Sequence, residues 1–349
     1  MEGWVIRSVT NSVAILIPIF NDWESVRMLL PQIGSALENT SWRGQVCLVD
    51  DGSTAQLPHQ WSTDFPQCLE SIEVLHQRRN LGHQRAIAMG LFHIHENYQA
   101  AAVLVMDGDG EDRAQDIAAL LAEFDRLDRK EVVFAARTKR MEGALFKTFY
   151  VLYRWSHHLL TGITVQVGNF SVIPPLALSR LMVVSELWNH YAAAIFRARI
   201  PHSLLPLPRG QRLTGDSKMN FVSLLVHGLS AMSVFSDQVS ARVLIGAMGL
   251  ATILAASMLL WPGENGWVMI LLGVEVIMLS LQFVFTIISG RNNLGFIPIR
   301  DSRYFTMSRT AILQRINSMD SLAAALGGVT ARTLAEDSTK ERQIFYDRH

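Results

Sequence analysis

Hydrophobic residues in the first half of the chain form short continuous runs separated by amphipathic stretches. Five runs rich in β-branched residues have the pattern of strands covered on both faces: 13–19, 46–49, 72–75, 102–106 and 132–135. Between the runs, apolar residues recur at helical spacing in 23–37, 84–96 and 114–127. The alternation predicts an α/β domain with a mainly parallel sheet. Ligands of such sheets bind beyond the carboxyl ends of the strands, so the polar residues that follow each run are the candidates for chemistry.

Two later segments are apolar enough to cross a bilayer. Residues 243–261 contain no charged residue, and residues 267–290 contain only Glu275. Each approaches the ~20 apolar residues that a bilayer core requires. Tryptophans bracket the turn between them, and arginines flank the pair but not the turn. The positive-inside tendency then predicts a transmembrane hairpin with both chain ends in the cytoplasm, in a membrane of the bacterial inner-membrane type. A buried hairpin of a soluble protein is the alternative, and the lack of charge disfavours it.

These patterns divide the chain into a catalytic domain, a juxtamembrane interfacial segment, two spans and a cytoplasmic tail, at 1–220, 221–240, 241–290 and 291–349. Residues 144–161 are rich in aromatics and cations, a composition typical of an interfacial helix or of an ordinary half-buried one. The tail is polar apart from one amphipathic piece, 312–326, and we expect it to lie along the cytoplasmic surface or to be partly disordered.

Composition adds little to this picture. Lys+Arg and Asp+Glu are both 31, so the net charge is zero and nothing indicates a nucleic-acid partner. The mean hydropathy of +0.20 is high for a soluble enzyme, and the excess lies after residue 240. With two cysteines and no apolar signal core at the N-terminus, we expect no disulfide scaffold, and we expect the catalytic part to remain on the side of the membrane where it is made.

The strongest chemical signal follows the fourth run. Four acids lie within six residues there: Asp107, Asp109, Glu111 and Asp112. Their mutual repulsion is costly unless a cation is bound, and hard oxygen ligands favour Mg²⁺ or Mn²⁺, which in turn bind phosphate oxygens. A solvated acidic loop is the alternative, but it is less common directly after a buried strand.

Three weaker motifs follow the other strands. Asp50 and Asp51 could accept hydrogen bonds from a base N–H or a ribose hydroxyl, or could simply form a turn. Gly82 precedes a predicted helix with Arg85 in its first turn, an arrangement suited to a diphosphate. After the first run, Phe20 could stack on a base.

The order of these motifs resembles the family 2 inverting glycosyltransferases of the GT-A fold. It comprises Pro-x-Phe-Asn-Asp, Asp-Asp-Gly-Ser, Asn-x-Gly and Asp-x-Asp. The basic segment 209–218, followed by the apolar hairpin, resembles the branch that contains dolichyl- and undecaprenyl-phosphate sugar transferases. The likeness covers about residues 12–290. It implies a nucleotide-sugar donor, UDP- or GDP-linked, and a lipid-linked acceptor, with polyprenyl phosphate foremost.

The resemblance also implies roles for individual residues. The base and ribose of the donor would be held by Pro18, Phe20, Asp22 and Asp51. Asp107 and Asp109 match the motif that binds the metal and the sugar diphosphate, and Glu111 stands where the branch usually has a metal-binding Gln. The acceptor phosphate would be bound by Arg137, Lys147, Arg212 and Ser217.

Some features leave alternatives open. Glu111 and the segment Gly168-Asn169-Phe170 depart from the branch pattern and bear on the acceptor. If the acceptor is a hydroxyl of a glycolipid or polysaccharide precursor, a general base is needed, and Glu186 and His190 are the candidates. Two other classes are open. A nucleotidyltransferase is disfavoured because no Gly-rich basic loop follows the first strand, and a non-catalytic membrane protein is disfavoured because the acid cluster is intact. Association through the spans is left open.

Overall fold

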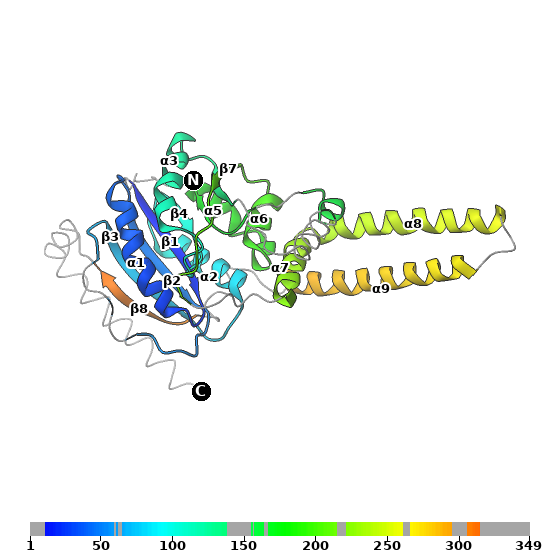
Figure 1. Cartoon of the computed structure of the whole chain (residues 1–349), viewed down its shortest axis with the longest axis horizontal. Coiled ribbons are helices and arrows are strands. Elements are labelled where there is room, and N and C mark those ends of the chain that lie inside the picture. The colour runs from blue at the N-terminus through cyan, green and yellow to red at the C-terminus, as the bar shows by residue number, and fades with distance from the viewer. Residues whose placement is uncertain are drawn as a thin grey trace, which may run out of the picture. The chain divides into compact units, whose positions relative to one another are not determined.

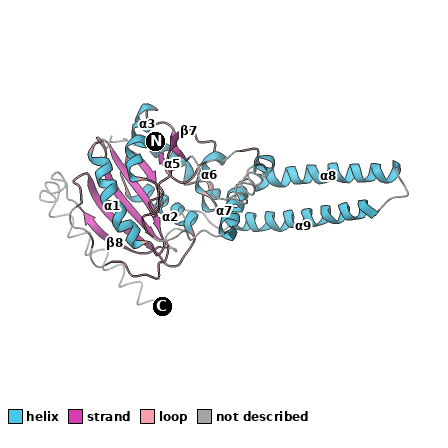
Figure 2. Cartoon of the chain, in the orientation of Figure 1, coloured by secondary structure: helices cyan, strands magenta, loops and turns pink. Residues whose placement is uncertain are grey.

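The computed structural model describes residues 11–58, 61, 65–137, 155, 157–163, 167–214, 221–260, 266–294 and 306–314. Its strands are β1 (Ser12–Ile19), β2 (Arg43–Asp50), β3 (Leu69–Gln77), β4 (Ala102–Val105), β5 (Val132–Arg137), β6 (Ser171–Ile173), β7 (His202–Leu207) and β8 (Thr306–Gln314). Its α-helices are α1 (Trp23–Glu38), α2 (His83–Asn97), α3 (Ile117–Arg126), α5 (Pro175–Leu181), α6 (Tyr191–Arg197), α7 (Phe221–Ser233), α8 (Ser236–Leu260) and α9 (Gly266–Leu294). Short 3₁₀ turns, η1 (Ala114–Asp116) and η2 (Ser185–Trp188), precede α3 and α6. Figures 1 and 2 show how the helices and strands are arranged.

The strands form one sheet in the order β7-β5-β6-β4-β1-β2-β3-β8. β1 pairs in parallel with β2 and β4, β2 with β3, and β5 with β7, whereas β6 runs antiparallel between β4 and β5. The predicted α/β class with a mainly parallel sheet is therefore confirmed. In β1 every residue is buried, which explains its uninterrupted apolar sequence.

Helices cover both faces of the sheet. On one face α2, α5 and α6 pack against Leu16, Val49 and Val105 in a continuous apolar core. A Cβ at Gly90 of α2 would collide with Leu16 and Val49, so the missing side chain lets this helix approach the sheet closely. On the other face, Leu37 of α1 lies over Gly44, the second residue of β2, where an added Cβ would be 2.8 Å from Leu37 Cδ1. Phe124 of α3 lies near Trp42.

The helices α8 and α9 are both long and apolar enough to cross a membrane, over Ser236–Leu260 and Gly266–Phe283. The first begins seven residues before the predicted segment, and most of the described apolar side chains on both helices are exposed. Between the helices, Ser240 Oγ lies 2.9 Å from Thr286 Oγ1 and accepts a hydrogen bond from Gln282 Nε2 at 2.7 Å. Glu275 of α9 is buried.

The sheet is larger than the sequence pattern suggests, because β6, β7 and β8 carry weak signals. β6 has only three residues, and β7 contains a proline and alternates in exposure as an edge strand does. The tail was expected to lie along the cytoplasmic surface or to be partly disordered. In its described part, residues 306–314, it forms β8, which joins the sheet beside β3. Of the segment 144–161, only 155 and 157–161 lie within the described residues, where they are helical.

Candidate active site

The carboxyl ends of β1, β2 and β4 bring the sequence motifs to one edge of the sheet. Ile19 is in register with Asp50, and Leu16 is in register with Val105, so the residues that follow these strands meet there. The Asp51 N–H donates to the Ile19 carbonyl at 2.8 Å. Parallel pairing is therefore the reason that motifs far apart in the sequence share one site.

The acid cluster after β4 is a tight loop. Asp112 is buried, and its Oδ2 accepts a hydrogen bond from the Asp107 N–H at 2.7 Å. Asp109 Oδ1 accepts one from the Glu111 N–H at 2.9 Å, and Gly110 has φ +87°. Asp112 therefore shapes the loop. The side chains of Asp107, Asp109 and Glu111 remain partly exposed, at 27%, 18% and 21%.

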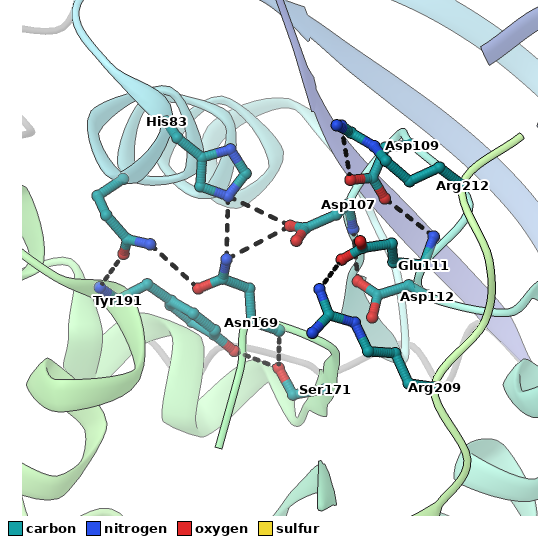
Figure 3. A network of polar contacts seen from close by, with 11 residues as sticks. His83, Asp107, Asp109, Glu111, Asp112, Asn169, Ser171, Tyr191, Arg209 and Arg212 are labelled. Atoms are coloured by element: carbon teal, nitrogen blue, oxygen red, sulfur yellow. Dashed lines mark hydrogen bonds and ion pairs between the residues drawn. The ribbon is translucent and has the colours of Figure 1, made fainter. Parts of the chain in front are cut away.

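A basic loop, residues 209–213, lies along the acid loop. Gly210 N–H donates to the Glu111 carbonyl and Leu213 N–H to the Asp109 carbonyl, both at 2.9 Å. Arg212 pairs with Asp109 at 2.9 Å, and Arg209 pairs with Glu111 (Figure 3). Arg212 was predicted to bind the acceptor, whereas no role was predicted for Arg209, which lies in the same segment.

The electrostatics of the acid loop favour a cation. Burial raises the pKa of Asp109, and the charges of Asp107 and Glu111 raise it further. Partial desolvation would lower the pKa of His83, but the nearby carboxylates of Asp107 and Asp109 raise it overall. Negative charge is thus concentrated here beyond what the nearby side chains balance. Partly exposed carboxylates with this excess are a donor set that fits Mg²⁺ or Mn²⁺.

Two residues that the sequence analysis did not assign lie against Asp107. His83, the first residue of α2, places Nε2 3.2 Å from Asp107 Oδ1. Asn169, just before β6, donates from Nδ2 to Asp107 Oδ1 at 3.3 Å and lies 2.9 Å from His83 Nε2 (Figure 3). His83 directly follows the Asn-x-Gly motif, so the sequence could have indicated that it lies at the site. The position of Asn169 depends on the antiparallel insertion of β6, which the sequence did not predict.

The carboxylates of Asp50 and Asp51 are hydrogen-bonded to other groups of the protein. Asp51 accepts hydrogen bonds from the Leu81 and Gly82 N–H groups at 2.7 and 2.8 Å, and burial raises its pKa. Asp50 accepts one from the Ser53 N–H at 2.9 Å and lies 2.9 Å from His76 Nδ1. In this structure both carboxylates hold the loops that frame the site.

The remaining predicted donor-binding residues lie at the same edge. Pro18 is in register with Val49, and Phe20 is 40% exposed, so its ring is accessible to a base. Asp22 is the N-cap residue of α1, and Gly82, with φ +93°, is that of α2. Arg85 stacks 5.2 Å from the Trp188 ring, and burial lowers its pKa.

The residues predicted for the acceptor are less fully described. The backbone of Arg137 ends β5 in register with Leu207, and its side chain lies outside the described residues. Lys147 and Ser217 also lie outside them. Arg212 is the one member of this predicted set whose side-chain contacts are described, in the ion pair with Asp109.

The mostly parallel sheet with an acid loop at its carboxyl edge agrees with the transferase class expected from the motifs. Residues 14–187 match the model of the family described as "Glycosyl transferase family 2", and the chain belongs to this family of glycosyltransferase enzymes. The match agrees with the GT-A fold expected from the motifs and with the sheet observed here.

Curated relatives carry more specific names. The chain is 25% identical over 225 residues to "Undecaprenyl-phosphate 4-deoxy-4-formamido-L-arabinose transferase" of Salmonella choleraesuis, covering 62% of this chain and 64% of that protein. It is 22% identical over 296 residues to "Dodecaprenyl-phosphate galacturonate synthase" of Rhizobium johnstonii, covering 78% and 85%. The chain thus spans less than two thirds of the length of the arabinose transferase.

Solved structures are more distant. Mannosyl-3-phosphoglycerate synthase from Rubrobacter xylanophilus matches with a TM-score of 0.45 and 14% identity, covering 65% of this chain and 74% of that one. Glucosyl-3-phosphoglycerate synthase from Mycobacterium tuberculosis, in complex with Mn²⁺, UDP-glucose and phosphoglyceric acid, matches with a TM-score of 0.45 and 12% identity, covering 69% and 85%.

Proposed function

We propose that the protein is a membrane-bound inverting glycosyltransferase that moves a sugar from a UDP- or GDP-sugar to polyprenyl phosphate, with Mg²⁺ or Mn²⁺ as cofactor. One observation carries the proposal: the acid loop at the carboxyl edge of the sheet is faced directly by the basic loop. The acid loop suits the metal and the donor diphosphate, whereas the basic loop suits an anionic acceptor. The names of the curated relatives support this choice of acceptor.

On the donor side, Asp107, Asp109 and Glu111 would hold the metal. When bound, the metal neutralises the charge that develops on the leaving nucleoside diphosphate. The loops held by Asp50 and Asp51 frame the nucleotide, and Phe20 offers a ring for its base. Gly82 opens α2, whose N-terminal N–H groups suit a phosphate.

On the acceptor side, a lipid phosphate is already an anion at neutral pH, so it needs positioning cations and no strong base. Arg209 and Arg212 would exchange their carboxylate partners for the acceptor phosphate, beside the anomeric carbon of the donor sugar. Arg137, Lys147 and Ser217 remain predicted members of this acceptor site.

The alternative acceptor, a sugar hydroxyl, finds less support. His190 is buried, and its Nδ1 accepts a hydrogen bond from the Ala193 N–H at 3.4 Å as the cap of α6. Glu186 lies 3.6 Å from Arg197 in an ion pair. Both candidate bases therefore have partners within the protein, which favours the phosphate acceptor.

For location, we propose that α8 and α9 form a transmembrane hairpin in a bacterial inner membrane, with the catalytic domain and both termini cytoplasmic. The length and apolar surface of the two helices support the hairpin, and the arginines that flank it support the orientation. A lipid-linked acceptor would then reach the basic loop from the membrane surface. Self-association through the exposed faces of the hairpin is compatible with this arrangement.

The test is a transfer assay with purified protein in detergent. A panel of labelled UDP- and GDP-sugars is supplied with Mn²⁺ or Mg²⁺, with and without undecaprenyl phosphate. We expect a labelled lipid that depends on both the metal and the polyprenyl phosphate, and we expect Asp109→Ala to abolish it without loss of folding. Metal-dependent transfer to glycolipid hydroxyls alone would refute the acceptor, and full activity of Asp109→Ala would refute the metal site.

A further inference from the structure

The strand that follows the apolar hairpin, β8, contacts the donor side of the site through one histidine. β8, orange in Figure 1, lies beside β3 in the sheet. Thr310 of β8 places Oγ1 3.1 Å from His76 Nε2, and the other ring nitrogen of His76, Nδ1, lies 2.9 Å from Asp50 Oδ2. His76 therefore joins a strand from late in the chain to a carboxylate of the loops that frame the site.

The hydrogen-bonding capacity of these three groups allows both contacts at once. An ionised carboxylate can only accept, so His76 Nδ1 donates to Asp50. A hydroxyl can donate or accept, so Thr310 satisfies Nε2 whether or not that nitrogen carries a proton. The side chains of His76 and Asp50 are only 14% and 10% exposed, so water competes little for these positions. The ring is thus held from both sides.

From Asp50 the hydrogen bonds continue to the loop after β1. Asp50 Oδ1 accepts from the Ser53 N–H at 2.9 Å, and Ser53 Oγ accepts from the Asn21 N–H at 2.9 Å. Asn21 Oδ1 in turn accepts from the N–H groups of Thr54 and Ala55, each at 2.9 Å. The loops after β1 and β2 are therefore held to each other and, through Asp50, to His76.

The conformation of the loop after β1 depends on such hydrogen bonds. Asn21 has φ +56°, a left-handed conformation that asparagine adopts when its side chain can bond to nearby groups. It lies between Phe20 and Asp22, both of which are predicted to bind the donor nucleotide. Because the backbone of Asn21 sets the directions of its two neighbours, the contacts that hold Asn21 also orient the base-binding side chains.

We propose that His76 is a positioning residue of the donor-nucleotide site and that Thr310 of β8 holds its ring in place. The chain beyond the apolar hairpin thereby completes the nucleotide site, 234 positions after His76. This inference rests on the proposed function, which assigns a nucleoside diphosphate to the loops after β1 and β2.

Hydrogen exchange, followed by mass spectrometry on the full chain in detergent without nucleotide, tests the link itself. In Thr310→Val, the backbone amides of residues 20–22 and 53–55 should exchange about two- to tenfold faster, the range expected for the loss of one neutral hydrogen bond. Thr310→Ser keeps a hydroxyl and should exchange as the wild type does. Thr306→Val, at the start of the same strand, is the matched control and should leave these amides unchanged.

His76→Asn is the second variant, because it keeps an N–H group near the position of Nδ1 and removes Nε2. It should accelerate exchange of the same two loops. Once Nε2 is lost, the hydroxyl of Thr310 has no ring to hold, so adding Thr310→Val to His76→Asn should have no further effect. Additive effects of the two changes would overturn the link.

Nucleotide binding and transfer test the role in function. The dissociation constant for UDP or GDP with Mn²⁺, measured by calorimetry, should rise by about two- to tenfold in Thr310→Val. The KM for the nucleotide-sugar should rise by the same factor, whereas kcat and the KM for polyprenyl phosphate should stay close to the wild-type values. A general weakening of the fold would not confine its effect to the donor.

The outcomes separate this inference from the proposed function. Unchanged loop exchange in both Thr310→Val and His76→Asn would overturn the inference and leave the proposed function intact, because exchange needs no substrate. An equal effect of Thr306→Val would also overturn it. Failure of the wild-type chain to bind UDP or GDP would instead refute the donor in the proposed function, and this inference with it.

Discussion

Substitution of Gly210 by alanine tests whether the basic loop must dock on the acid loop. A Cβ at Gly210 would lie 2.6 Å from the Gly110 carbonyl oxygen and 2.8 Å from Arg113 Cγ. The first neighbour is backbone, so the basic loop must move away. The change alters no charged residue, and it should therefore report on docking rather than on the loss of a cation.

The size of the effect follows from the contacts that hold the loop. Movement of the loop breaks two backbone hydrogen bonds, Gly210 to Glu111 and Leu213 to Asp109, whereas the long arginine side chains can follow their carboxylate partners. Two hydrogen bonds are worth about 1–3 kcal/mol together. Their loss lowers the docking equilibrium by about 5- to 150-fold, since 1.4 kcal/mol corresponds to a factor of about ten.

Limited trypsin digestion measures docking directly, because the loop contains Arg209 and Arg212. Cleavage after Arg212, followed by mass spectrometry, should accelerate by about the same factor when opening is fast relative to cleavage. In the transfer assay, the KM for polyprenyl phosphate should rise. Gly246→Ala is the matched control, because a Cβ there meets no atom within 4 Å. If Gly210→Ala is cleaved and transfers sugar as the wild type does, the docked loop has no part in function.

Three further predictions concern the acids and the cysteines. Asp109→Asn should lower the affinity for Mn²⁺ at least tenfold, measured by calorimetry. The reason is that burial and the neighbouring carboxylates make the charge of Asp109 unfavourable unless a cation is bound, and the variant removes that charge. Unchanged affinity would exclude Asp109 as a ligand. Asp51→Asn should lower the unfolding free energy by about 1–3 kcal/mol in chemical denaturation, because its new NH₂ group faces a backbone N–H; a stability equal to that of the wild type would contradict this. In the native protein at pH 8, Cys68 should be alkylated by iodoacetamide before Cys47, because Cys47 is fully buried and burial raises its pKa. The difference should vanish on denaturation. Equal rates in the native protein would show that β2 opens readily.

Much of the fold was predictable because it is encoded locally. The runs that became β1 and β2 are apolar at consecutive positions, since both faces of a central parallel strand are covered. The acid loop was predictable for the same reason, because it begins where the buried run of β4 ends. The antiparallel strand β6 was not predictable, since three residues carry too little pattern to be recognised.

The contacts between distant segments were not predictable either. Asn169 and Asp107 are 62 positions apart, and Arg212 and Asp109 are 103 apart. Their approach depends on the strand order and on loop geometry, including the positive φ of Gly110. No pattern of neighbouring residues records these distances.

The sequence by itself determined the central strands, the helices between them and the apolar hairpin, and which strand end carries the acids, because burial and charge follow patterns of neighbouring residues. Only the tertiary structure decided what faces those acids. The insertion of β6 brings Asn169 beside Asp107 and His83, and the chain after β7 lays Arg209 and Arg212 against Glu111 and Asp109. The physical reason is that the sequence specifies each group's chemistry, whereas the folded backbone sets the distances on which hydrogen bonds and ion pairs depend.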